Sequence, residues 1–396
     1  MRGGADEVAI QSALGLSMAG QTVVFFGGAG LVDMRLKNVE VVAPGLKSVH
    51  EGAGIGRVLR GFWNLRAARV IRRSLALLSD SKEPRVALVH SYTKVLSPIV
   101  FSECRRAGIP VVFIMHDHFA FCPNGNYFQF PRNVPCDCRP LSSQCWTTNC
   151  DSRGRWVKSV RMLRSSMISE LGLLERNCAG FIAVSSLGLS FARNFLPGRK
   201  IELVRNPLPV SSGGRNEGHE GNGRPVYIGR LTRSKGVLVL AEAARDANLR
   251  IDFVGEGECE AELQNRFPEA RCWGWLPRGR TQVILRNSSL LVLPSLWPET
   301  FGLTVAEALS QGVPALVSTR AGAAELISPG QNGWLWNPSR IADLPELLKQ
   351  VREPNRLRMM SESASRIYAA EEQGIEPHAR NLTQALGRLL TSRGVA

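Results

Sequence analysis

The sequence predicts an α/β protein built from two doubly wound, Rossmann-like domains that face each other across a cleft. Short β-branched or apolar runs alternate with helical stretches along almost the whole chain, which is typical of parallel sheets made of βαβ units. The length of 396 residues suits two or three domains. Residues 206–224 are rich in Gly, Pro, Ser and Asn and interrupt the alternation, so we expect an exposed linker there.

The expected elements fall into two series on either side of this linker. In the first domain, residues 1–205, we expect strands at 21–26, 38–43, 85–90, 110–115, 180–184 and 200–204. In the second domain, residues 225–374, we expect strands at 225–229, 250–254, 270–273, 289–293, 314–318 and 333–336, with helices at 235–247, 258–267, 302–311 and 341–351. Residues 375–396 carry leucines at helical spacing and predict a terminal helix.

The composition excludes several classes of protein. Apolar residues make up 44% and charged residues 21%, which is ordinary for a globular domain and excludes a disordered or collagen-like chain. No apolar run approaches the roughly 18–20 residues that a membrane-spanning helix needs. Residues 1–7 lack the apolar core of a signal peptide, and nine cysteines would leave one unpaired in a full disulfide framework. We therefore expect a reducing, cytoplasmic location.

The positive charge is concentrated in the first half of the chain. Residues 1–205 hold 27 Lys and Arg against 14 Asp and Glu, whereas the rest of the chain holds 22 against 20. A basic half favours an anionic partner, either nucleic acid or a membrane surface. Zinc-finger spacing, RNP-like aromatic motifs and helix-turn-helix patterns are absent from the sequence, which argues against nucleic acid. Residues 57–73 place arginines around an apolar stripe. They predict either a helix resting on anionic lipid or a core-packed helix with a solvated basic face.

The second domain opens with a candidate diphosphate site. The strand at 225–229 ends in Gly229, which permits a tight turn, and is followed by Arg230 and by Lys235 at the start of the next helix. Two cations beside a helix N-terminus favour a diphosphate. Taken alone, the pattern also fits two solvated side chains on a loop.

A second constellation follows the strand at 289–293. Glu299 is expected on the loop before a helix, and Glu307 about one turn into that helix. The backbone N–H groups of Phe301, Gly302 and Leu303 between them would point at an anion. Carboxylates accept hydrogen bonds from sugar hydroxyls, so the set favours a polyhydroxylated, anionic ligand.

These motifs resemble those of the family 4 glycosyltransferases, which have the GT-B fold. Residues 296–308 (LWPETFGLTVAEA) are similar to the Glu-x7-Glu motif of the family, and GRLTRSKG at 229–236 to its phosphate signature. FVGEGECEAEL at 253–263, WGWLP at 273–277 and TRAGAAELISPGQNGWLW at 319–336 match its pattern in order. The resemblance covers nearly the whole chain and is strongest over residues 225–340.

The resemblance implies a role for each matching residue. Arg230 and Lys235 would hold the donor diphosphate and stabilise charge on the leaving group. Glu307 would accept hydrogen bonds from the nucleotide ribose, and Glu299 would orient the donor sugar. The remaining donor contacts would come from the backbone amides of Phe301, Gly302 and Leu303. The nucleotide base would stack near residues 275–278, and the helix at 375–396 would pack back on the first domain.

In the first domain the resemblance points to His116 and to a glycine loop. His116 directly follows the strand at 110–115 and is similar to the active-site histidine that contacts the donor sugar. The alternative is a histidine satisfied by its surroundings, next to Asp117 as a helix cap. Residues 3–7 (GGADE), with Gly3 and Gly4, resemble the glycine loop that approaches the donor phosphate and the acceptor; the alternative is an irregular terminus. That loop normally follows the first, central strand, for which this chain has no residues, so we expect a misplaced start codon or a truncated reading frame.

The resemblance implies a retaining glycosyltransferase that moves a sugar from a UDP- or GDP-sugar to a glycan or lipid-linked acceptor. The setting would be cell-envelope or exopolysaccharide synthesis, with possible contact to the inner face of the membrane. Neither a metal nor a cofactor would be required, and the leaving phosphate would help to deprotonate the acceptor. The absence of an Asp-x-Asp motif agrees with this. Two alternatives stay open: a truncated, inactive paralogue that binds nucleotide, and a GT-B nucleotide-sugar epimerase.

Four cysteines lie close together in the first domain. Cys136, Cys138, Cys145 and Cys150 fall within 15 residues of one another. Four thiolates could hold a structural zinc ion, although the spacing C-x-C-x6-C-x4-C is not a standard pair of knuckles. The alternative is a set of free thiols on a loop.

Overall fold

The structure, a computed structural model, describes residues 4–28, 34–36, 39–48, 51, 55–77, 83–210 and 223–391. The chain divides into two compact units. The first consists of Met1–Gly125, Asp137–Pro207 and Gly374–Ala396, and the second of Asn126–Cys136 and Leu208–Gln373. Most of the predicted linker, residues 211–222, lies outside the described residues. No helix in the described ranges is both long enough and apolar enough to cross a bilayer.

The first unit contains the six strands that the sequence predicts for it, arranged in two parallel sheets. One sheet has the order β3-β4-β7-β8, with β3 at Ala87–Val89, β4 at Val111–Met115, β7 at Cys178–Ala183 and β8 at Ile201–Leu203. The other pairs β1, Val24–Phe26, with β2, Glu40–Val42. All five residues of β4 are buried, as expected for a central parallel strand. The expectation of an absent first strand stays a prediction.

Helices surround these sheets. They are α1 (Gly4–Met18), α2 (Ile55–Phe62), α3 (Leu65–Leu77), α4 (Ile99–Arg106), α5 (Ser143–Thr147), α6 (Arg155–Glu170), α7 (Leu173–Asn177), α8 (Ser186–Phe195) and α15 (Ile375–Thr391), with the short 3-10 helix η1 at Met34–Leu36. The last helix, α15, packs on α1, and Ser12 Oγ lies 2.9 Å from His378 Nε2 between them. The terminal helix therefore belongs to the first unit.

The prediction of a glycine loop at the start of the chain is wrong for Gly4. Gly4 is the exposed first residue of α1, because the segment from Gly4 to Met18 has the length and the apolar residues to form a helix against α15. Gly3 lies outside the described residues. The structure thus gives Gly4 no place in a loop after a strand.

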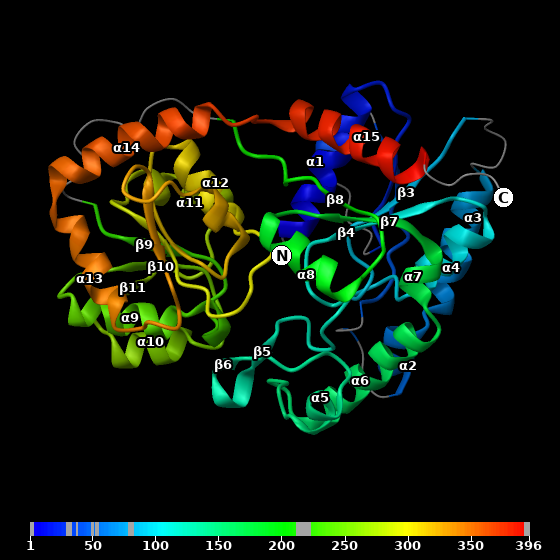
Figure 1. Cartoon of the computed structure of the whole chain (residues 1–396), viewed down its shortest axis with the longest axis horizontal. Helices are drawn as coiled ribbons and strands as arrows, with labels where there is room; N and C mark the ends of the chain where they lie inside the picture. The colour runs from blue at the N-terminus through cyan, green and yellow to red at the C-terminus, as the bar shows by residue number, and fades with distance from the viewer. Residues whose placement is uncertain are drawn as a thin grey trace. The chain divides into compact units, whose positions relative to one another are not determined.

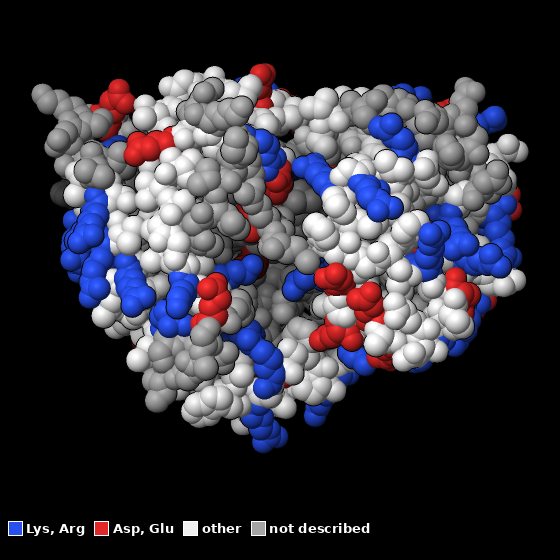
Figure 2. Space-filling model, turned by 180° about the vertical axis from the view of Figure 1, so that it is seen from behind, with Lys and Arg blue, Asp and Glu red and all other residues white. Residues whose placement is uncertain are grey.

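The basic segment 57–73 forms two helices, not one. The break falls at Asn64, whose Oδ1 accepts a hydrogen bond from Ala67 N at 3.2 Å and whose Nδ2 donates to Val95 O at 2.8 Å. Asn64 is thus the N-cap of α3, which begins at Leu65, whereas α2 already ends at Phe62. On α3, Ala67, Ala68 and Ile71 are buried, while the arginines of the same helix, Arg66, Arg69, Arg72 and Arg73, are exposed. Figure 2 shows one face of the molecule, on which Lys and Arg side chains gather in several groups.

The second unit is a doubly wound sheet. Its six strands are all parallel and have the order β11-β10-β9-β12-β13-β14. The strands are β9 (Val226–Ile228), β10 (Asp252–Val254), β11 (Arg271–Cys272), β12 (Leu291–Leu293), β13 (Ala315–Ser318) and β14 (Gly333–Trp336). Since chain order reverses between β9 and β12, this edge is the topological switch point at which such sheets bind ligands. The Rossmann-like fold predicted for this half is confirmed.

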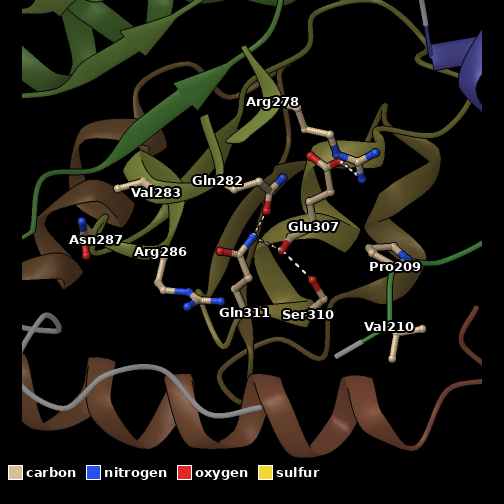
Figure 3. A pocket seen from close by; sticks show the side chains of 10 residues that line it. All are labelled: Pro209, Val210, Arg278, Gln282, Val283, Arg286, Asn287, Glu307, Ser310 and Gln311. Carbon is tan, nitrogen blue, oxygen red and sulfur yellow. Dashed lines mark hydrogen bonds and ion pairs between the residues drawn. The ribbon is translucent and has the colours of Figure 1, made fainter. Parts of the chain in front are cut away.

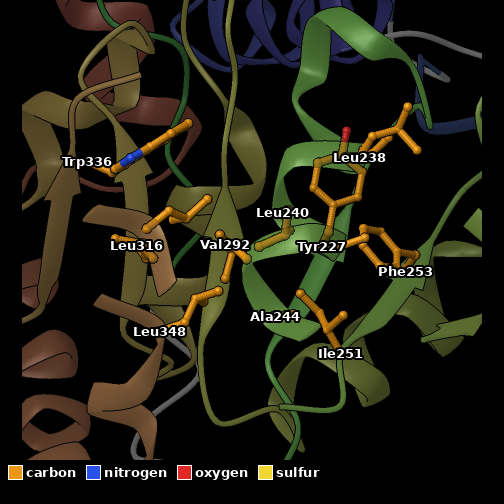
Figure 4. Packing of buried hydrophobic residues seen from close by; sticks show 14 of the residues in the cluster. Tyr227, Leu238, Leu240, Ala244, Ile251, Phe253, Val292, Leu316, Trp336 and Leu348 are labelled. Atoms are coloured by element: carbon orange, nitrogen blue, oxygen red, sulfur yellow. The ribbon is translucent and has the colours of Figure 1, made fainter. Parts of the chain in front are cut away.

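Helices cover both faces of this sheet (Figure 1). On one side lie α9 (Val237–Asp246), α10 (Glu260–Arg266) and α13 (Asp343–Lys349), and on the other α11 (Arg278–Arg286), α12 (Leu303–Ser310) and α14 (Pro354–Ala369). Three-residue 3-10 helices, η3 (Arg233–Lys235) and η5 (Gln350–Arg352), and the longer η4 (Gly322–Leu326) complete the connections. Tyr227, Phe253, Val292 and Trp336 are buried in the core beneath α9 (Figure 4).

A hairpin from the first half of the chain belongs to the second unit. Strands β5 (Phe128–Gln129) and β6 (Val134–Pro135) pair antiparallel around the 3-10 helix η2 (Phe130–Arg132). Phe128 is fully buried in the core cluster of the second unit. The expected boundary of the first domain, which kept residues 1–205 together, differs here, because burial of one phenylalanine in a distant core leaves no periodic signal in the sequence.

Candidate active site

The candidate donor site of the second unit lies at the carboxyl ends of β9 and β12. The loop after β9 carries Arg230 and leads through η3 into α9, and the loop after β12 carries Glu299 and leads into α12. Both helices therefore begin at the same edge of the sheet. Two helix N-termini at a switch point form a favourable place for an anion.

Gly236 allows these two loops to touch. Its φ is +73°, in the left-handed region, and a Cβ at this position would lie 2.1 Å from the carbonyl oxygen of Pro294. The amide of Leu296 also donates to the carbonyl of Ser234 at 3.0 Å. A side chain at position 236 would force the loops apart, which explains the glycine in the segment 229–236.

Lys235 and Glu299 meet at this contact. Lys235 Nζ lies 2.5 Å from Glu299 Oε1, and each side chain is only 13% exposed. The second carboxylate oxygen of Glu299 accepts a hydrogen bond from Ser295 Oγ at 2.5 Å. The ammonium also stands 5.3 Å from the ring centre of Trp297. Lys235 and Glu299, both expected at the donor site, thus form a partly buried, hydrogen-bonded ion pair. The sequence analysis did not predict that these two residues contact each other.

The backbone around Glu299 is fixed by the loop after β13. Glu299 N donates to Arg320 O at 2.9 Å, and Glu299 O accepts from Gly322 N at 2.9 Å. One step further, Phe301 O accepts from Ala323 N at 2.7 Å. These bonds hold the segment before α12 rigidly, so that the first turn of the helix has a defined position.

The N-terminus of α12 begins at Gly302. This residue has φ +112°, and a Cβ there would lie 2.7 Å from Leu293 Cδ2. The side chain of Phe301 is buried, so this residue offers the site its backbone only. First-turn amides of a helix have no intrahelical acceptor. Leu303 is the first residue of α12 and Gly302 its N-cap, whereas Phe301 lies just before the helix.

Glu307 lies one turn into α12, as the sequence predicts, and pairs with a residue that the sequence did not suggest for this role. Its Oε1 is 3.4 Å from Arg278 Nη2 at the start of α11. Both side chains line a pocket of about 480 Å³ together with Gln282, Arg286 and Gln311 (Figure 3). The remaining lining residues are Pro209, Val210, Val283, Asn287 and Ser310. Arg230, Lys235 and Glu299 do not line this pocket, so the pocket includes the expected ribose ligand Glu307 but not the expected diphosphate ligands.

Arg230 is placed at the end of β9 by its backbone. Its carbonyl accepts a hydrogen bond from Tyr227 Oη at 2.8 Å, while its side chain is exposed. Burial raises the pKa of Tyr227 well above its ordinary value, so this phenol remains a neutral donor. Because the backbone of Arg230 is held at the end of β9 and its side chain is exposed, its guanidinium lies in solvent at the switch point.

In the first unit His116 follows β4 directly and faces a second histidine. His90, at the end of the neighbouring strand β3, places Nδ1 2.9 Å from His116 Nε2, and the two rings stack with centroids 5.1 Å apart. Our sequence reasoning missed His90. A signal was present, because neighbouring parallel strands end at the same edge, and His90 ends the predicted strand 85–90 as His116 follows the strand 110–115.

Burial keeps both imidazoles neutral. It lowers the pKa of His116 to about 4, with a smaller contribution from the positive charge that His378 would carry. Burial, followed by His116 itself and then His378, also lowers the pKa of His90 well below its ordinary value. With one proton between the two facing nitrogens, one ring donates and the other accepts, so the tautomers of His90 and His116 depend on each other.

Asp117 is engaged locally. Its Oδ1 accepts a hydrogen bond from Phe119 N at 3.0 Å, the geometry of an Asx turn. Burial raises the pKa of this carboxyl group above its ordinary value. The interpretation of Asp117 as a local cap is therefore supported by a hydrogen bond. His116, in contrast, has His90 as a hydrogen-bond partner.

The four clustered cysteines do not assemble as a zinc site. Within the described part of the chain, no three His, Cys, Asp or Glu side chains are grouped so that they could hold a metal ion. Cys145 and Cys150 instead both contact the ammonium of Lys158, at 3.5 and 3.1 Å. The zinc hypothesis is thus left without support, because the described residues bring no third metal-ligand side chain to Cys145 and Cys150.

Comparison with known proteins connects this geometry to a family. A family profile described as glycosyl transferases group 1 matches residues 216–367. A GDP-mannose-dependent alpha-mannosyltransferase of Corynebacterium glutamicum is 28% identical over 217 residues, which are 54% of this chain and 48% of that protein. The sulfoquinovosyl transferase SQD2 of Arabidopsis thaliana is 30% identical over 158 residues, 37% of this chain and 30% of that protein.

Solved structures agree over the full length. HepE of Anabaena in complex with UDP and glucose has a TM-score of 0.66 at 16% identity and covers 97% of this chain and 96% of its own. Sucrose-phosphate synthase from Thermosynechococcus elongatus has a TM-score of 0.68 at 16% identity, with 98% and 94% covered. The chain has the GT-B fold of these structures, and its residues 216–367 match the glycosyl transferases group 1 family. Its match spans about half the length of the Corynebacterium relative.

Proposed function

We propose that this chain is a retaining, family 4 glycosyltransferase that transfers a sugar from a nucleoside-diphosphate donor to a glycan or lipid-linked acceptor. The observation that carries the proposal is the joint placement of Lys235, Glu299 and the first turn of α12 at the switch point of the second unit. A cation and a set of backbone donors suit the diphosphate, and a carboxylate suits sugar hydroxyls.

In this proposal Lys235 and Arg230 neutralise the charge that develops on the diphosphate as the glycosidic bond breaks. The amides of Phe301, Gly302 and Leu303 add hydrogen bonds to phosphate or sugar. When the diphosphate binds, Lys235 exchanges part of its 2.5 Å contact with Glu299 for phosphate oxygens. The carboxylate is then available to the donor sugar. The leaving phosphate takes the acceptor proton, so that neither a protein nucleophile nor a metal or cofactor is needed.

Glu307 is proposed to bind the nucleotide ribose. Its side chain is 23% exposed, is paired with Arg278 and lines the pocket, so a ribose hydroxyl can donate to its carboxylate there. Arg278 is itself at the end of residues 275–278, where we expect the base to stack. The relatives point to two donor classes, since one is named for GDP-mannose and one structure holds UDP. We therefore propose a UDP- or GDP-sugar.

His116 is proposed to act in catalysis as a neutral imidazole that contacts the transferred sugar, with His90 as its positioning residue. The exposed arginines of α3 would contact anionic lipid, which suits a lipid-linked acceptor. This would place the enzyme in the cytoplasm at the inner face of the membrane, in cell-envelope or exopolysaccharide synthesis. Two putative colanic acid glycosyltransferases among the relatives agree with such a setting.

The donor site is tested by thermal unfolding of the purified chain with UDP, GDP, ADP and their common sugar conjugates. Ligand at about 100 times its Kd should stabilise the protein by roughly 2.7 kcal/mol. Glu307→Ala should weaken nucleotide binding by about 1–3 kcal/mol, the loss of a charged hydrogen bond. Lys349→Met, which breaks an exposed ion pair of the same unit, is the matched control. Absence of a shift with every nucleotide would contradict the donor site.

Transfer is tested with the donor that binds. Arg230→Ala combined with Lys235→Ala should abolish transfer while circular dichroism stays unchanged, and turnover that persists would mean that the diphosphate lies elsewhere. Product anomers resolved by NMR should match the donor configuration. Donor isomerised without acceptor would favour an epimerase, and nucleotide binding without any turnover would favour an inactive paralogue.

A further inference from the structure

Lys158 is a buried ammonium group whose neighbours are thiols. It lies in the first turn of α6 and is 4% exposed. Nζ approaches Cys150 Sγ at 3.1 Å and Cys145 Sγ at 3.5 Å. Both cysteines are buried as well, at 3% and 6% exposed. In the described part of the chain no carboxylate forms a hydrogen bond or ion pair with Nζ.

A buried ammonium without a carboxylate is costly unless a neighbour takes a negative charge or the proton leaves. The nearest carboxylate in sequence, Asp151, is engaged by Arg161 at 2.9 Å. The two sulfur atoms are therefore the acceptors that Nζ contacts. The geometry places a side-chain nitrogen directly against an oxidisable sulfur.

From this geometry we propose that Lys158 and Cys150 are a site of oxidative modification, at which dioxygen joins Nζ to Sγ through one bridging oxygen atom. One N–H and the S–H bond break, and one N–O and one S–O bond form. One oxygen atom of dioxygen enters the bridge, and the other leaves as water with the two hydrogens. Nitrogen and sulfur are oxidised and dioxygen is reduced, so the step balances with no other reactant.

Cys150 is the partner of choice because its sulfur is the nearer of the two. Cys145 Sγ is directed also toward Met162 Sδ, at 3.8 Å, and sits on α5. Both contacts lie on the same buried nitrogen, so a bridge to Cys150 leaves Cys145 as a neighbouring reduced thiol. Bridging removes the charge of the buried ammonium and ties residue 150 to α6.

The bridge would act on the surroundings of His116. Further along α6, Arg161 Nη1 donates to Asn124 O at 3.3 Å, and Arg164 stands 5.8 Å from the ring centre of Phe119. Both partners belong to the segment that follows β4 and His116. Fixing the first turn of α6 should therefore stiffen this segment and raise the temperature of unfolding of the oxidised protein.

The experiment uses the whole chain, prepared without oxygen and in reductant, and then divided. One half is exposed to oxygen-saturated buffer and the other is kept anaerobic. Both are alkylated, digested with trypsin and analysed by mass spectrometry. The bridge joins the peptide 133–153 to the peptide 156–161, which stays uncleaved at Lys158. The pair should be heavier than the sum of its peptides by one oxygen and lighter by two hydrogens, and dithiothreitol should separate it.

Variants identify the atoms. Cys150→Ser and Lys158→Arg should abolish the linked pair, whereas the matched variant Cys145→Ser should retain it. Because the wild-type mass is informative by itself, a variant that fails to fold does not remove the test. Four results would overturn the proposal. They are the absence of a linked pair after oxidation, a Cys145–Cys150 disulfide whose mass includes no additional oxygen atom, oxidation of sulfur that leaves Lys158 unmodified, and zinc bound to the purified chain.

Discussion

The ion pair between Lys235 and Glu299 gives the sharpest test of the candidate site. Replacing Lys235 by Met keeps the length of the side chain but leaves the Glu299 carboxylate with Ser295 as its remaining side-chain partner. Breaking a fully buried pair by removing one partner costs about 3–5 kcal/mol. Since each of the two side chains is still 13% exposed, we expect the free energy of unfolding of the second unit to fall by about 2–4 kcal/mol.

The pairing itself is measured by a double-mutant cycle of Lys235→Met and Glu299→Gln. The double variant should be more stable than the sum of the single losses predicts, by at least about 1 kcal/mol, because it leaves neither charge unpaired. Hydrogen exchange of peptides from β9 and β12 reports the opening of the second unit alone.

The matched control is Lys349→Met. Lys349 forms an ion pair with Glu346 at 2.6 Å, but their side chains are 41% and 71% exposed. Exposed pairs contribute little, so this variant should change stability by less than about 1 kcal/mol. If the two losses at Lys235 and Glu299 simply add, within about 0.5 kcal/mol, the pair is not coupled and our account of the site is refuted.

Three further predictions follow from single contacts. Because the pKa of His116 falls from 6.5 to about 4 on folding, the unfolded chain binds more protons between these values. The free energy of unfolding should therefore decrease as the pH falls from 6.5 to 4, by up to about 1.4 kcal/mol per pH unit for each such histidine. Urea unfolding of the wild type and of His116→Gln at several pH values checks this. An equal dependence of the unfolding free energy on pH in both proteins would contradict it. Gly236→Ala should destabilise the second unit by more than the roughly 1–2 kcal/mol that a left-handed backbone costs a residue with a Cβ, because the new Cβ would clash with the Pro294 carbonyl. It should also weaken nucleotide binding. Calorimetry with and without nucleotide measures both effects, and unchanged stability would be inconsistent with the loop contact. Asn64→Ala should cost about 1 kcal/mol through the lost cap of α3, seen as faster hydrogen exchange in its first turn, whereas an unchanged rate would show that α3 is not capped there.

The local pattern of the chain determined most of its fold. Strands at 110–115 and 289–293 are short apolar runs bounded by helical stretches, and they appear as β4 and β12 because burial on both faces of a parallel sheet requires such runs. The spacing of Glu299 and Glu307 likewise placed one carboxylate on a loop and the other a turn into α12. These properties depend on near neighbours, which the sequence displays directly.

Only the tertiary structure decided which side chains meet. The Lys235–Glu299 pair joins residues 64 positions apart, and the Glu307–Arg278 and His90–His116 contacts join different elements of the fold. Phe128 is buried in a unit distant from it in sequence, and Lys158 contacts two of the four cysteines that suggested zinc. Such contacts depend on how strands are ordered and loops packed, and no periodicity in the chain encodes that order.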